Sequence, residues 1–143
     1  IPEITSGLIE IKAVAREAGS RAKVAVYSAD PNIDTVGACI GQKGLRIKNI
    51  VNELNGEKID IVIWKESVEE FVSAVLSPAK VKSVEVIEDE NTARVIVDNS
   101  QLSLAIGKNG QNARLAAKLT GMRVDIKTEN SSKEDSLEGE QSE

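Results

Sequence analysis

The sequence predicts an α+β protein with two similar domains in tandem, each a three-stranded sheet packed on helices. Three observations lead to this prediction. Residues 40–44 and 106–110 share the pattern Ile-Gly-x-x-Gly. Runs that alternate apolar and polar residues precede each copy, as half-buried strands do, and apolar residues at helical spacing follow it. The glycines are therefore expected in a turn between two helices of a duplicated unit.

The first domain is expected to span residues 1–65. Its leading strand should place Ile9 and Ile11 on the same inner face, because they are two residues apart. Asp34 or Thr35 is expected to cap the short helix before the glycine turn. The expected elements are strands at 8–16 and 21–28, a short helix ending at Ile40, a helix ending at 55–56 and a strand at 58–64.

The second domain is expected to span residues 66–128 and to begin with a helix at 67–77. Residues 67–70, Ser-Val-Glu-Glu, form a capping box, and Pro78 closes this helix. We expect its apolar stripe to pack on the sheet of the second domain, with a partner-binding helix as the alternative. Asn99 or Ser100 should cap the next helix. The other expected elements are strands at 81–88 and 92–98, helices ending at Ile106 and at 120–121, and a strand from Arg123.

Charge is distributed unevenly along the chain. The net charge is −5, and residues 129–143 carry six acidic residues and one lysine, so residues 1–128 are neutral. We interpret residues 129–143 as a disordered acidic tail, because their composition cannot bury a core. Residues 36–52 and 99–124, around the two glycine turns, contain basic residues and no acidic ones. Positive charge therefore collects where a phosphate could bind.

Several functional classes are disfavoured by composition. The chain has no histidine and one cysteine, Cys39, which removes the usual general base and every His/Cys metal cluster. We therefore expect no enzyme, no metal and no cofactor. No apolar run is long enough to span a bilayer, and a single cysteine fits a reducing cytoplasmic compartment. Asp60 and Asp125 occupy matched places but are expected on outward strand faces. The chain begins with Ile1, which suggests a fragment of a longer protein.

The order strand, strand, helix, Gly-x-x-Gly, helix, strand resembles the KH domain in its type II arrangement. Longer stretches are similar to the tandem KH segment of the NusA family of bacterial transcription factors, and the resemblance covers residues 1–128. Thr35 departs from the family, which usually has proline there, as does Met122, where an aromatic residue is common. The stretches that carry the resemblance are 13–17, 36–41, 52–54, 57–61, 76–81 and 105–116.

The resemblance implies that the protein binds single-stranded RNA, namely the nascent transcript. We expect the protein to be a monomer. The resemblance also implies a role with RNA polymerase and other transcription factors in pausing, termination and antitermination. From the residues themselves, the glycines let the backbone approach a phosphate and the basic residues add charge. Ile40 and Ile106 are expected to form the floor of a base-binding groove, or to be ordinary core residues. The predicted RNA contacts are Gly41, Gln42, Lys43, Gly44, Arg46 and Lys48, and Gly107, Lys108, Asn109, Gly110, Gln111, Asn112 and Arg114.

Other binding functions fit the sequence less well. A helix-turn-helix DNA reader has no strands flanking each repeat as a rule. An RRM needs exposed aromatic residues, and this chain has only Tyr27, Trp64 and Phe71. The alternative that stays open is a docking platform for another protein, in which the two repeats form a rigid scaffold.

Overall fold

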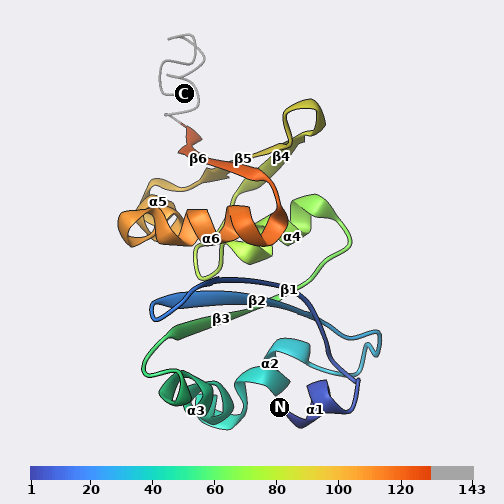
Figure 1. The fold of residues 1–143 in the computed structure, drawn as a ribbon. Helices are drawn as coiled ribbons and strands as arrows, with labels where there is room; N and C mark the ends of the chain where they lie inside the picture. The colour runs from blue at the N-terminus through green and yellow to red at the C-terminus, as the bar shows by residue number, and fades with distance from the viewer. Residues whose placement is uncertain (130–143) are drawn as a thin grey trace. The chain divides into compact units, whose positions relative to one another are not determined.

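The computed structural model describes residues 1–129, and they form two three-stranded sheets, each packed on helices (Figure 1). The predicted α+β class is confirmed. The chain divides into two compact units, Ile1–Glu66 and Ser67–Glu143. The predicted acidic tail lies, apart from Glu129, outside the described residues. No helix in the described part of the chain has the length and apolarity needed to cross a bilayer.

The first unit has a mixed sheet in the order β1-β2-β3. β1 and β2 form the antiparallel hairpin, whereas β2 and β3 are parallel, so the chain must cross over between them. The crossover carries α2 and α3, and Figure 1 shows both on one side of the sheet. The elements are α1 (Pro2–Thr5), β1 (Glu10–Glu17), β2 (Arg21–Tyr27), α2 (Thr35–Ile40), η1 (Gln42–Gly44), α3 (Leu45–Glu53) and β3 (Lys58–Ile63).

The core of the first unit forms around Ile9, Val26 and Cys39, which are at most 1% exposed. Ile1 and Ile4, which flank and occupy α1, pack against this cluster, so the short helix is held by its apolar residues. Burial raises the pKa of the Cys39 thiol, which keeps it protonated and unreactive.

The predicted alternation of the first strand is wrong at Ile11. The register of β1 against β2 shifts between Ile11 and Ala13, which is a β-bulge. Ile11, before the bulge, is 45% exposed, whereas Ala15, beyond it, is 5% exposed. Ile9 lies ahead of β1 and is 1% exposed. An extra residue in one strand turns the following side chains over, and no alternation pattern alone reveals it.

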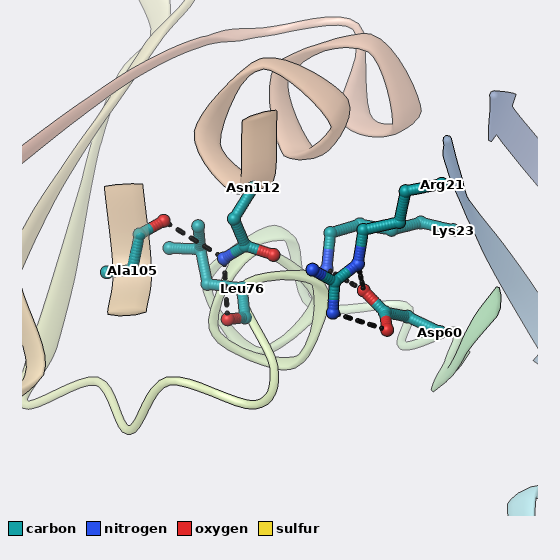
Figure 2. Close-up of polar contacts among 6 residues, drawn as sticks. All are labelled: Arg21, Lys23, Asp60, Leu76, Ala105 and Asn112. Carbon is teal, nitrogen blue, oxygen red and sulfur yellow. Dashed lines mark hydrogen bonds and ion pairs between the residues drawn. The ribbon is translucent and has the colours of Figure 1, made fainter. Parts of the chain in front are cut away.

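Two ion-pair clusters fasten the loops and strands of the first unit. Glu57 is buried and accepts hydrogen bonds from Arg16 at 2.7 and 2.8 Å and from the Gly19 amide at 3.0 Å. This ties the β1–β2 turn to the start of β3. Asp60 on β3 accepts bonds from both Arg21 and Lys23 on β2 at 2.9–3.0 Å (Figure 2). Asp60 was predicted on an outward face. Its carboxylate instead forms ion pairs with Arg21 and Lys23 that link β3 to β2.

The second unit repeats this topology, with the sheet order β4-β5-β6, β4 and β5 antiparallel, and β5 and β6 parallel. Its elements are α4 (Val68–Val75), β4 (Ser83–Ile87), η2 (Glu88–Glu90), β5 (Thr92–Val97), η3 (Asn99–Gln101), α5 (Leu102–Ile106), η4 (Lys108–Gly110), α6 (Gln111–Thr120) and β6 (Arg123–Thr128).

The predicted caps are partly confirmed. Ser67 caps α4 by accepting a bond from the Glu70 amide, and α4 packs on β4 and α6, as expected of its apolar stripe. In the helical turn that leads into α5, however, the cap is Asp98, not Asn99 or Ser100. The Asp98 carboxylate accepts from the Ser100 amide at 2.9 Å and from the Ser100 hydroxyl at 2.7 Å. A charged acceptor makes the stronger cap.

Candidate nucleic-acid interface

The two glycine turns have nearly the same backbone conformation. The first glycine has φ 82° and ψ 172° in one copy and φ 82° and ψ 166° in the other. Lys43 and Asn109, at the third position, have φ 56° and 57°, and the second glycine is left-handed in both copies. The duplicated pattern is therefore a duplicated geometry.

The first glycine is needed because the following helix begins right against it. A Cβ at Gly41 would lie 2.7 Å from Cγ of Arg46. A Cβ at Gly107 would lie 2.6 Å from the amide nitrogen of Asn112. Both distances are shorter than carbon contacts allow, so a side chain would push the helix away from the turn.

The second glycine faces open space. Nothing lies within 4 Å of a Cβ built at Gly44, and only the Arg114 guanidinium, at 3.8 Å, approaches one built at Gly110. Glycine is favoured here by the left-handed backbone, since no neighbour occupies the space. The outer side of each turn is therefore accessible to a ligand backbone.

The helices that follow the turns begin without a side-chain cap. The N-cap residue is Gly44 for α3 and Gly110 for α6, and neither has a side chain that could accept a bond from the first amides. By contrast α2, η3 and α4 are capped by Asp34, Asp98 and Ser67. The uncapped amides and the positive end of the helix dipole attract an anion. No acidic residue lies in the first turn of either helix.

Most of the predicted contact side chains are exposed around these helix ends. Gln42, Lys43 and Lys48 are exposed in the first unit, and Lys108, Asn109 and Arg114 in the second. Gln111 is half-buried. Each turn therefore has two exposed cations near it, Lys43 and Lys48 in the first unit and Lys108 and Arg114 in the second.

Arg46 and Asn112 both bond to the short helix that precedes their turn. They occupy matched positions, five residues after the first glycine. Arg46 donates to the Ala38 carbonyl and to Glu3, both at 2.7 Å. Each residue thus holds the C-terminal end of the short helix before the turn, α2 or α5.

Asn112 is 2% exposed, and its amide donates to the carbonyls of Ala105 at 2.9 Å and Leu76 at 3.0 Å (Figure 2). Its prediction as an RNA contact is corrected on this geometry, because the side chain is used inside the scaffold. Sequence reasoning did not find Glu3, the partner of Arg46, since the two residues are 43 positions apart and only the fold brings them together.

A groove of about 320 Å³ lies beside the second turn. It is lined by Ile106, Ala113 and residues 123–127 of β6. Ile106 is 37% exposed, so it is a groove residue more than a core residue, whereas Ile40 in the first unit is half-buried. β6 is an edge strand whose backbone can offer hydrogen bonds to a base. Arg123 and Lys127 also line the groove, and sequence reasoning did not single them out.

Comparison with protein families matches each half of the chain to a KH domain model. Residues 1–64 match the family model described as "NusA-like first KH domain", and residues 68–134 match "NusA-like second KH domain". Together the two models cover most of the chain.

Curated relatives carry the name transcription termination/antitermination protein NusA. The chain is 59% identical to the one from Halalkalibacterium halodurans and 58% identical to the one from Bacillus subtilis, over 94% of its own length. It spans only 35% and 36% of the length of these two relatives. The crystal structure of APE1850 matches with a TM-score of 0.62 and 25% identity, covering 83% of this chain and 88% of that one.

Proposed function

The chain is a tandem KH segment of the NusA family, and we propose that it binds single-stranded RNA through its two glycine turns. One observation carries the proposal. Both helices that follow the turns begin without a cap, at an open glycine and among exposed cations. An uncapped helix start among cations favours the binding of an anion. Because the arrangement occurs twice, it suits a ligand that carries several phosphates.

The turn and the groove would divide the work of recognition. The backbone at each turn would hold the sugar-phosphate chain, and the matching cations Lys48 and Arg114 would add charge one helical turn further on. Bases would enter the groove beside Ile106, where the edge strand β6 offers backbone donors and acceptors. A KH domain typically clamps four nucleotides, so two domains can hold a longer strand with avidity.

We further propose that the bound RNA is the nascent transcript. This rests on the printed names of the relatives, which describe transcription termination and antitermination. Because the chain spans about a third of those proteins, contacts with RNA polymerase and effects on pausing would belong to the longer protein. The family is one of RNA-binding transcription factors and not of enzymes, in agreement with the expectation from composition.

The test is to replace the two inner residues of each turn with aspartate, Gln42-Lys43 and Lys108-Asn109, in the full chain. RNA binding is measured by fluorescence anisotropy with short single-stranded RNAs of graded length, at several salt concentrations. We expect salt-sensitive binding by the unmodified chain and its loss in the variant, since aspartate repels phosphate.

A control variant replaces Lys65 and Lys80, exposed lysines remote in sequence from the turns, with aspartate and should retain binding. Circular dichroism shows whether each variant is folded. Unchanged affinity in a folded turn variant would reject the phosphate-binding role and favour the protein-docking platform.

A further inference from the structure

We propose that the two glycine turns are not equivalent and that the second is the preorganised anchor for the phosphate chain, with Arg114 as the residue that makes it so. This inference rests on the proposed RNA binding. It concerns how the site is divided between the two units, which the shared motif does not reveal.

The guanidinium of Arg114 is bonded to the turn itself. Its Nη1 donates to the carbonyl of Asn109 at 2.9 Å. The same nitrogen lies 3.8 Å from the place where a Cβ of Gly110 would stand. The cation is therefore held over the third and fourth positions of the turn, next to the uncapped start of α6.

Lys48 occupies the matched position in the first unit but has a different kind of side chain. Its ammonium is an exposed point charge on a flexible stem, and in residues 1–129 the structure shows no bond from it to the Lys43 carbonyl. A lysine must lose its rotamer freedom when it meets a phosphate. An arginine fixed over the turn has already lost much of that freedom and can present a planar fork to phosphate oxygens.

The backbone of the two turns is so similar that the bond made by Arg114 in the second unit could also be made in the first. Lys43 has φ 56° and ψ 23°, and Asn109 has φ 57° and ψ 25°, so their carbonyls point in the same direction relative to the following helix. An arginine at position 48 can therefore form the bond that Arg114 forms. The two turns therefore differ as phosphate-binding sites because of one side chain, Lys48 or Arg114, and not because of their backbone.

The experiment exchanges the two cations without changing the charge. Arg114→Lys and Lys48→Arg are made in the full chain, with Lys118→Arg, an exposed lysine on α6, as the matched control. Affinity for a single-stranded RNA long enough to contact both turns is measured over a series of salt concentrations.

We expect Arg114→Lys to weaken binding about 3- to 10-fold, which corresponds to ordering one long side chain. We expect Lys48→Arg to tighten binding by about 3-fold for the same reason. The slope of affinity against salt should stay the same in all variants, because the number of neutralised phosphates is unchanged.

Three outcomes would overturn the inference while leaving the proposed function intact. These are equal affinities in all variants, a loss in Arg114→Lys with a changed salt slope, and a Lys48→Arg variant that gains nothing. Absence of RNA binding by the unmodified chain would instead reject the proposed function. Thermal unfolding of each variant excludes a loss of fold as the cause.

Discussion

Replacing Asn112 with alanine should destabilise the second unit without removing a direct contact to RNA. The side chain amide donates to two carbonyls inside this unit. Without it, the Leu76 carbonyl keeps a bond from the Ala79 amide at 3.0 Å, but the Ala105 carbonyl at the end of α5 loses a buried donor.

The expected loss of stability can be worked out from the hydrogen bonds that the Asn112 side chain makes. Leaving the Ala105 carbonyl unsatisfied costs about 1–3 kcal/mol, and the lost bond to Leu76 adds about 1 kcal/mol. Removing Oδ1 of Asn112, a buried acceptor without a partner in the described part of the chain, returns about 1 kcal/mol. The free energy of unfolding of the second unit should therefore fall by about 2 kcal/mol.

The assay is a urea titration followed by two-dimensional NMR, in which amide peaks from α5 and α6 report the second unit separately. Lys118→Ala, an exposed substitution on the same helix, is the control and should change stability by less than about 0.5 kcal/mol. RNA affinity measured where the protein is folded should keep its salt slope. A variant of normal stability that binds RNA weakly would refute the reasoning and return Asn112 to the RNA contacts.

Two further predictions concern charge and backbone in the first unit. The bond from Arg16 holds the pKa of the Glu57 carboxyl below its ordinary value, so the pair stabilises the fold above about pH 4.5 and is lost as the pH falls through the lowered pKa. Glu57→Gln should therefore be less stable than the unmodified chain at neutral pH, and thermal melts should show this gap closing in acid; a gap that stays constant would contradict it. Lys43→Asn should raise stability by about 0.5 kcal/mol, because asparagine tolerates the left-handed backbone that lysine disfavours. It should also lower the salt slope of RNA binding by about one unit. A less stable Lys43→Asn would show that the turn is not strained.

Local signals were enough to predict most of the fold. The repeat of Ile-Gly-x-x-Gly, the capping box at Ser67 and the alternation in β2 and β5 each depend on residues close in sequence, and the structure confirms the elements they predict. The bulge after Ile11 could not be predicted, because it depends on how β1 pairs with a neighbouring strand.

The candidate site was predictable only in part, for the same physical reason. The glycines and the exposed lysines follow from the motif and from charge. The internal role of Asn112 does not, because the carbonyl of Leu76 that it holds lies 36 residues away. A polar residue beside a glycine turn looks the same in sequence whether it faces a ligand or a neighbouring carbonyl. Only burial separates the two cases.

The unlike side chains that hold α2 and α5 give the two units different responses to ionic strength. In the first unit, the side chain at this place is a guanidinium paired with Glu3, and both groups are partly exposed, so dissolved ions screen their attraction. In the second unit, neutral amide bonds of a buried Asn112 do the same work and are insensitive to salt. Raising the salt concentration should therefore weaken the proposed RNA contacts of both units and, in the first unit, also the ion pair between Arg46 and Glu3. If RNA binds at both turns as proposed, a salt titration would report only RNA binding at the second turn, but both RNA binding and the strength of the Arg46–Glu3 pair at the first.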